Sequence, residues 1–207
     1  FPEISFNKSH VRSNVLFLTT GLGLGGAEKV IFDICKNINK RKYEVSVIGI
    51  SLQKERLHAF HENKIHAYCL NQKKTFYAFF NSIVEIRKHV NNHCIQIIHA
   101  HMFHTIVIAC VLKLFNPKIK VIFTPHNSFQ SMKIRALILF LMKPWRNIDT
   151  IFSKSAIRFF YKSSAAIIPN GIDLKNYAGN ARNFSRNIFT FIVIGRLEFM
   201  KNHEFLI

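Results

Sequence analysis

The stretch that decides the fold is Asn14-Val-Leu-Phe-Leu-Thr-Thr-Gly-Leu-Gly-Leu-Gly-Gly-Ala-Glu28. Its first half is a short apolar run, which is typical of a strand buried on both faces. The run ends at a cluster of glycines, and from Ala27 onward apolar residues recur at helical spacing as far as Ile38. The sequence therefore predicts a buried strand, a glycine-rich loop and a covering helix.

The same alternation continues along the chain. Further strands are predicted at 44–50, 65–70, 95–100, 120–124, 150–152 and 165–168. Helices are predicted at 55–63, 75–90, 105–114, 130–142 and 154–162. Strands that alternate with helices form a parallel sheet covered on both faces, so the predicted fold class is α/β, with a doubly wound parallel sheet.

The chain changes character after residue 168. Residues 169–186 are polar and rich in turn formers, and a new apolar run from Ile188 to Ile194 follows and is closed by Gly195. We therefore expect three parts: a first domain over 1–168, a linker over 169–186, and the first strand and helix start of a second domain over 187–207.

The charge is strongly positive. The chain of 207 residues carries 29 Lys and Arg against 11 Asp and Glu, a net charge of +18. Such a charge attracts polyanions, whether lipid headgroups, nucleic acid or phosphorylated substrates. Because no zinc-finger spacing, basic heptad region or RNP signature accompanies it, we expect no nucleic-acid partner.

The cysteines and the chain start indicate a cytoplasmic protein. The four cysteines are widely spaced within apolar segments, so neither a metal knuckle nor a disulfide framework is predicted. No charged segment followed by an apolar run stands at the start, so we expect no secretory signal. The apolar stretch from Ala136 to Met142 is far shorter than the roughly 20 residues that span a bilayer.

The glycine loop is a candidate anion site, because the amides that open a helix can receive phosphate oxygens. Gly21, Gly23 and Gly26 also match the dinucleotide fingerprint G-x-G-x-x-G. The acidic residue that binds the ribose of NAD is absent after the second strand, but Lys54 and Arg56 could accept the phosphate of NADP. An NADP-linked oxidoreductase or epimerase therefore stays open, as does a glycine turn needed only for packing.

Histidines follow two of the predicted strands. His99 and His101 should point to the same face of the sheet, and a metal site there stays open, although no carboxylate or cysteine stands nearby to complete it. His126 follows the next strand and is better placed to meet a ligand. No paired carboxylates or G-x-S-x-G elbow favour a hydrolase.

Four motifs stand in order: Gly25-Gly-Ala-Glu28, Thr124-Pro-His126, Ile168-Pro-Asn-Gly-Ile-Asp173 and Gly195-Arg-Leu-Glu-Phe-Met-Lys-Asn202. With them the chain resembles the family 4 glycosyltransferases of the GT-B fold, in which two Rossmann-like domains face each other across a cleft. The resemblance covers nearly everything from Asn14 to Ile207. It implies that residues 1–168 are the acceptor-side domain, and that 187–207 begin a truncated domain that binds the nucleotide sugar.

The resemblance also implies a role for each motif. Arg196 and Lys201 would bind the donor diphosphate, and the Gly25 and Gly26 amides would approach the same phosphates. His126 would contact the transferred sugar at the catalytic centre. Further contacts to the acceptor or the sugar are expected from Glu28, His101 and Asn127. At about 4 Å and an effective dielectric near 20, each cation would contribute roughly 4 kcal/mol before desolvation.

The reaction implied by the resemblance is a retaining transfer of a hexose or N-acetylhexosamine. The donor would be a UDP- or GDP-sugar, and the acceptor a lipid-linked saccharide or another precursor of a bacterial surface polysaccharide. No metal or other cofactor is expected. The family's second domain normally continues beyond this chain's end and carries a pair of glutamates that hold the donor, so we expect this truncated chain to be inactive alone. A non-catalytic basic protein that keeps half the fold is the alternative.

The segment Lys133-Ile-Arg-Ala-Leu-Ile-Leu-Phe-Leu-Met-Lys-Pro-Trp-Arg146 has an apolar centre flanked by cations. Interfacial helices share these features, but a covering helix of the sheet would also be apolar. Together with the positive charge, the segment predicts an anionic membrane partner at the inner face of the cell membrane. If the helix inserts, the predicted membrane contacts are Leu137, Leu139, Leu141 and Trp145.

Overall fold

The computed structural model describes residues 12–73, 75–126, 133–171, 191–195 and 202–206. The chain divides into two compact units, Phe1–Gly171 and Ile172–Ile207, which are described separately below. The predicted sites Asn127, Arg196 and Lys201 lie outside the described residues.

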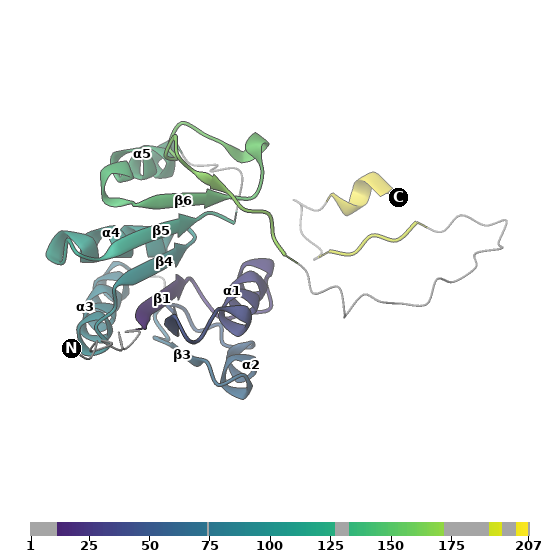
Figure 1. The fold of residues 1–207 in the computed structure, drawn as a ribbon. Helices are drawn as coiled ribbons and strands as arrows, with labels where there is room; N and C mark the ends of the chain where they lie inside the picture. The colour runs from purple at the N-terminus through teal and green to yellow at the C-terminus, as the bar shows by residue number, and fades with distance from the viewer. Residues whose placement is uncertain (1–11, 74, 127–132, 172–190, 196–201, 207) are drawn as a thin grey trace, which may run out of the picture. The chain divides into compact units, whose positions relative to one another are not determined.

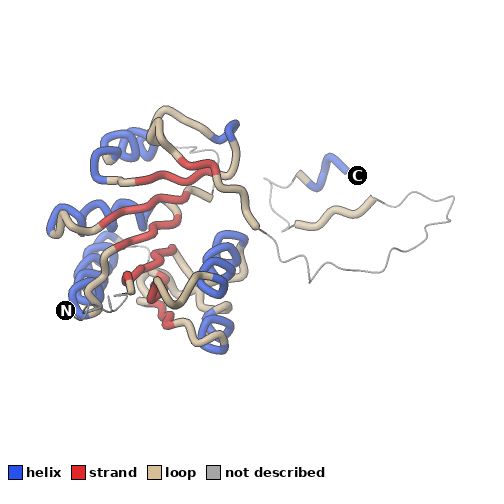
Figure 2. Tube along the Cα trace, in the orientation of Figure 1, coloured by secondary structure: helices blue, strands red, loops and turns tan. Residues whose placement is uncertain are grey.

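The first unit contains a parallel sheet. Its strands are β1 (Ser13–Thr19), β2 (Tyr43–Gly49), β3 (His66–Cys69), β4 (Ile97–His101), β5 (Lys120–Thr124), β6 (Ile148–Ile151) and β7 (Ala166–Ile167). They are ordered β3-β2-β1-β4-β5-β6-β7, and every neighbouring pair is parallel (Figures 1 and 2). The order runs outward in both directions from the β1–β4 pair, which confirms the predicted doubly wound fold.

Helices cover both faces of this sheet (Figure 1). They are α1 (Gly26–Asn37), α2 (Leu57–Glu62), α3 (Phe76–Asn92), α4 (Phe103–Phe115) and α5 (Lys133–Leu141). Short 3-10 turns follow at η1 (Lys143–Trp145) and η2 (Lys154–Ala156). Most of the predicted elements are present, with ends that differ by at most three residues.

Strand β1 shows why the sequence folds this way. Val15 and Phe17 pack into one core with residues of α1 and α2, whereas Leu16 and Leu18 pack into a second core with residues of α3, α4 and α5. Each of the four side chains is at most 5% exposed. Burial of a large apolar side chain contributes roughly 1.5–3 kcal/mol, so an unbroken apolar run is the pattern that a two-sided central strand requires.

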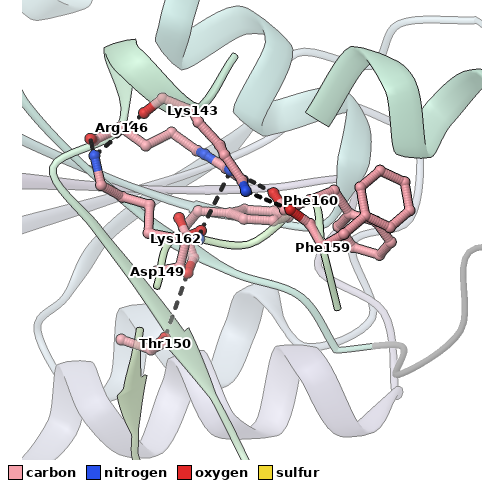
Figure 3. Close-up of polar contacts among 8 residues, drawn as sticks. Lys143, Arg146, Asp149, Thr150, Phe159, Phe160 and Lys162 are labelled. Atoms are coloured by element: carbon pink, nitrogen blue, oxygen red, sulfur yellow. Dashed lines mark hydrogen bonds and ion pairs between the residues drawn. The ribbon is translucent and has the colours of Figure 1, made fainter. Parts of the chain in front are cut away.

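The predicted helix at 154–162 is wrong. Only Lys154–Ala156 form a helical turn, of the 3-10 type. In that helix the amide of Lys162 would donate to the carbonyl of Arg158, but it donates to Oδ2 of Asp149 at 2.7 Å. The carbonyls of Phe159 and Phe160 accept hydrogen bonds from Lys143 and Arg146 (Figure 3). Long-range hydrogen bonds thus replace the local ones that the apolar spacing favours.

The second unit differs from the prediction as well. Of the predicted strand at 188–194 the structure describes residues 191–194, and these pair with no described strand. Ile194 is 93% exposed. Residues His203–Leu206 form a 3-10 turn, η5.

Candidate functional site

The candidate site lies at the carboxyl edge of the sheet. Because all strands are parallel, the ends of β1, β4 and β5 meet at one edge, and ligands of open α/β sheets bind there. The glycine loop leaves β1 at this edge, His101 ends β4, and His126 follows β5. The structure therefore brings together the predicted residues that it describes at one edge.

The glycine loop is pinned to the segment after β2. The amide of Leu22 donates to the carbonyl of Gln53 at 2.8 Å, and the amide of Arg56 donates to the carbonyl of Leu22 at 2.8 Å. A Cβ on Gly21 would lie 2.6 Å from Oγ of Ser51. Since no described glycine has a positive φ, Gly21 is needed for this close approach and not for an unusual backbone conformation.

Helix α1 opens without a side-chain cap. Gly25 is its N-cap residue, and the first helical hydrogen bond runs from the amide of Lys29 to the carbonyl of Gly25 at 3.2 Å. The N-cap residue therefore gives the amides of the first turn no side-chain partner. A Cβ on Gly25 would lie 2.3 Å from Oε2 of Glu28, so the Glu28 carboxylate folds back over this turn.

A histidine pair forms the centre of the edge. Nδ1 of His101 lies 2.9 Å from Nε2 of His126, and the two rings are stacked with centroids 5.1 Å apart. The ring centroids of His99 and His101 are 4.2 Å apart, which confirms that both point to the same face. Phe152, just after β6, packs against His126 with a centroid distance of 5.4 Å.

Hydrogen bonds across three strands support this pair. Nε2 of His99 lies 2.7 Å from Oγ1 of Thr124, which in turn contacts Oγ1 of Thr150. Thr124 ends β5 and Thr150 belongs to β6, so the contacts join β4, β5 and β6 at their carboxyl ends. Sequence reasoning missed Thr124 and Thr150 as partners, because their proximity depends on strand register.

Burial keeps these histidines neutral. It lowers the pKa of His99 to about 3 and the pKa of His126 to about 4, and it holds the pKa of His101 well below its ordinary value. Removing an imidazolium from water is unfavourable, and the neighbouring rings add to the effect for His99 and His101. Near pH 7 the cluster therefore offers hydrogen bonds and no positive charge, so it suits a sugar hydroxyl better than a diphosphate.

The metal hypothesis for His99 and His101 gains no support. Across the described ranges, no group of three or more His, Cys, Asp or Glu side chains is arranged to hold a metal ion. Nε2 of His99 contacts Thr124, and Nδ1 of His101 contacts His126.

A cavity of about 440 Å³ opens at the same edge, beside the ends of β1 and β2. Apolar side chains of Ile50 and Phe79 line it together with Lys73, His104 and Arg135. Thr75 caps α3 at its rim by accepting from the amide of Ala78 at 3.2 Å. Sequence reasoning missed this cavity, because its residues come from distant segments that share no motif.

A buried ion pair holds the strand that carries Thr150. Nη2 of Arg146 lies 3.3 Å from Oδ2 of Asp149, and both side chains are 0% exposed (Figure 3). Arg146 also donates to the carbonyl of Phe160 at 2.7 Å, and the amide of Lys162 donates to Asp149 at 2.7 Å. Burial raises the pKa of Asp149, against the opposing effect of Arg146. The pair thus ties the chain before β6 to the segment that leads into β7.

The doubly wound sheet and the ligand edge define the chain as a Rossmann-like α/β domain of the kind found in the N-terminal halves of GT-B glycosyltransferases. The model of Glycosyltransferase Family 4 matches residues 24–188. The chain belongs to glycosyltransferase family 4. No curated protein matches the chain.

Solved structures of the same fold agree. HepE from Anabaena, solved in complex with UDP and glucose, has a TM-score of 0.67 at 15% identity over 80% of this chain and 46% of its own. A glycosyltransferase from Rickettsia africae has a TM-score of 0.65 at 13% identity over 81% and 45%. The lipopolysaccharide outer core galactosyltransferase WaaB has a TM-score of 0.58 at 14% identity over 79% and 47%. The chain thus spans less than half the length of these structures.

Proposed function

We propose that this chain is the acceptor-side part of a retaining glycosyltransferase that uses a UDP- or GDP-sugar. The transferred group is a hexose or an N-acetylhexosamine, and the acceptor is a lipid-linked saccharide or another surface-polysaccharide precursor. The observation that carries the proposal is the neutral His101–His126 pair beside the uncapped start of α1, in a chain of family 4. The pair supplies a hydrogen-bonding contact for a sugar, and the helix start supplies one for a phosphate.

Two kinds of group at the start of α1 are assigned to different substrates. Glu28 places a carboxylate over Gly25, so a phosphate can approach the amides of that turn only when the Glu28 side chain turns away. We assign Glu28 to a hydroxyl group of the acceptor substrate, because its carboxylate can accept the hydrogen bond that this hydroxyl donates. The Gly25 and Gly26 amides keep the predicted role toward the donor phosphates. Most of the positive charge for the diphosphate is assigned to Arg196 and Lys201, because the histidines are neutral.

The cavity beside β2 suits the acceptor. Its apolar part, with Ile50 and Phe79, can take a chain of low polarity, while Lys73 and Arg135 provide charges for a phosphate. Phe76 and Tyr77, on the first turn of the neighbouring α3, are 80% and 76% exposed. An amphiphilic acceptor would cover these rings when it enters the cavity.

We further propose that the chain binds an anionic membrane surface through α5. Ala136 and Leu139 are buried against the sheet, whereas Ile134, Leu137 and Leu141 are exposed. Leu139 is therefore core, and its predicted insertion is wrong. Phe140 and Phe159 extend the exposed apolar surface, with ring centroids 6.0 Å apart, and Lys143 lies 4.8 Å from the Phe140 ring. Apolar side chains beside cations suit an anionic bilayer surface. No helix in the described part of the chain is long and apolar enough to cross a bilayer.

The membrane proposal is tested with vesicles. The chain should sediment with vesicles of anionic lipid and not with neutral ones. Leu137→Ser with Leu141→Ser should weaken the part of the binding that survives high salt, since insertion does not depend on screening. Ile34→Ser with Leu52→Ser, at exposed apolar positions on other elements, is the matched control. Failure to bind anionic vesicles at low salt would overturn the membrane part of the proposal.

The transfer is tested in a protein in which the second domain is complete, because the chain alone is expected to be inactive. An open reading frame that continues past Ile207 into a domain with the glutamate pair would supply that protein and separate an enzyme from a non-catalytic relative. Arg196→Ala and Lys201→Ala should each lower transfer at least about tenfold, the effect of roughly 1.4 kcal/mol. Lys36→Ala, an exposed lysine at the far end of α1, is the control.

The competing oxidoreductase makes an opposite prediction. It requires NADP to bind near Lys54 and Arg56, with a change in cofactor fluorescence, and no response to nucleotide sugars. In the structure, the segment after β2 instead packs Ser51 and Gln53 against Gly21. Binding of NADP at micromolar concentration, with no transfer from any nucleotide sugar, would replace the proposed function.

A further inference from the structure

His101 lies behind His126 at the carboxyl edge. The side chain of His101 is 0% exposed, whereas His126 is only partly buried. Their one hydrogen bond joins Nδ1 of His101 to Nε2 of His126 at 2.9 Å. Nδ1 of His126 is the ring nitrogen that this bond leaves unused. A ligand at the edge would therefore meet His126, while His101 would act on the ligand only through it.

Two neutral imidazoles that share a hydrogen bond hold a single proton between them. Either His101 donates from Nδ1 and His126 accepts at Nε2, or His126 donates from Nε2 and His101 accepts. In the first arrangement Nδ1 of His126 carries the other proton and is a donor. In the second, Nδ1 of His126 is an acceptor. The choice between the two thus decides what His126 offers to a bound sugar.

The other nitrogen of His101 favours the first arrangement. Nε2 of His101 is buried and has no hydrogen-bond partner among the described residues. If His126 donated, Nε2 of His101 would be a buried N–H without an acceptor, and such groups are rarer in proteins than unpaired acceptors. Burial also keeps the pKa of both rings low, so neither imidazole carries a proton on both nitrogens near pH 7.

The threonine hydroxyls of the neighbouring strands bond to His99 and to each other. Thr150 donates toward the carbonyl of Phe123 in a long contact of 3.5 Å, so the proton between the two threonines belongs to Thr124. Thr124 then accepts from Nε2 of His99 at 2.7 Å. Each hydroxyl has one proton, so the Thr124 proton is donated to Thr150 and the Thr150 proton to the carbonyl of Phe123.

The backbone around His101 is held in an unusual shape. Met102, the next residue, has φ 78° and ψ 171°, a region that side chains other than glycine rarely adopt. Oγ1 of Thr105 donates to the carbonyl of His101 at 2.5 Å and lies 3.0 Å from the carbonyl of Met102. The amide of Met102 donates to the carbonyl of Thr124 at 3.3 Å. This bend between β4 and α4 fixes His101 against the strand that leads to His126.

We propose that His101 is a positioning residue that donates Nδ1–H to His126 and thereby fixes His126 as the tautomer protonated at Nδ1. His126 then presents a single N–H donor to an oxygen of the bound sugar. The sugar contact rests on the proposed function, but the tautomer does not. The test therefore reads the tautomer directly.

The experiment records imidazole ¹⁵N spectra of the chain at pH 7, where protonated and unprotonated ring nitrogens have well separated resonances. The wild-type chain should show His126 with a protonated Nδ1 and an unprotonated Nε2. His101→Phe keeps a ring but removes the donor, so His126 should become a mixture of the two neutral tautomers. His101→Asn places an amide N–H near the former Nδ1 and should restore it. His58→Ala, at an exposed position on α2, should change nothing.

A wild-type His126 protonated at Nε2 would overturn the proposal, even if His101→Phe does not fold. An unchanged His126 tautomer in a folded His101→Phe chain would overturn it as well. In the enzyme with a complete second domain, His101→Phe should lower kcat/KM about tenfold and His101→Asn should recover most of it. If no nucleotide sugar is transferred but the spectra are as expected, the proposed function fails and the positioning role stands.

Discussion

The buried pair of Arg146 and Asp149 provides the strongest stability prediction. Both side chains are 0% exposed, and Nε and Nη1 of Arg146 and Oδ1 of Asp149 already lack described partners. Asp149→Ala would leave the Arg146 charge buried without a carboxylate, next to the carbonyl of Phe160 and the ring of Phe123. Breaking such a pair by removing one charge costs about 3–5 kcal/mol, so we expect Asp149→Ala to lower the free energy of unfolding by that amount.

Removing both charges should cost less than removing one. Apolar residues of similar volume often replace a buried ion pair with little loss, so Arg146→Met with Asp149→Leu should be more stable than Asp149→Ala. The double-mutant cycle should give an interaction energy of at least about 1 kcal/mol, since the two residues are in contact. The exposed pair of Lys29 and Asp33 is the matched control, and breaking it should cost less than about 1 kcal/mol.

The assay is urea unfolding of the whole chain followed by circular dichroism, with the slope compared among variants. An Asp149→Ala cost below about 1 kcal/mol would show that the buried charge is relieved in another way, for example by water. Strict additivity of the two substitutions would also refute the reasoning.

Two further predictions concern stability. Gly26→Ala adds a Cβ that meets no atom within 4 Å, so it should raise the free energy of unfolding by about 0.5 kcal/mol in the same assay through helix propensity, yet lower transfer if a phosphate approaches this turn. His89, buried between Ser46 and Tyr68, has its pKa lowered to about 4 from 6.5 by burial, then by His93 and His66. The unfolded chain therefore binds the His89 proton first, so this residue alone should lower the free energy of unfolding by about 3 kcal/mol between pH 6.5 and pH 4. His99, His101 and His126, whose pKa values are also lowered, add to the loss, and His89→Asn should remove only the His89 share.

The parts of the fold that local pattern decides were predictable. The apolar run from Val121 to Phe123 lies between Lys120 and Thr124, with Pro125 after it, and the strand predicted at 120–124 has the same ends as β5. The helix predicted over 154–162 is wrong because Asp149, outside that segment, accepts the amide of Lys162 that a helix would direct to the carbonyl of Arg158. No local pattern reveals such a competition.

For the candidate site, the positions of the histidines along the chain were predictable, but their contacts were not. The sequence placed His101 and His126 at the ends of neighbouring strands, since ligands gather at that edge of a parallel sheet. It did not predict their mutual hydrogen bond, which needs the register that sets His101 opposite Thr124. It treated His101 as a ligand contact, whereas the structure places it behind His126. The cavity beside β2 was missed because Ile50, Phe79 and Arg135 have no spacing in common.

The most direct test of the proposed transferase is the release of UDP or GDP from sugar donors by the protein with a complete second domain, in the presence of a lipid-linked acceptor. We predict acceptor-dependent release that falls at least about tenfold in His126→Ala, while His58→Ala, at an exposed histidine on α2, keeps the wild-type rate. Equal rates in His126→Ala and His58→Ala would contradict the assignment of the carboxyl edge as the site of sugar transfer.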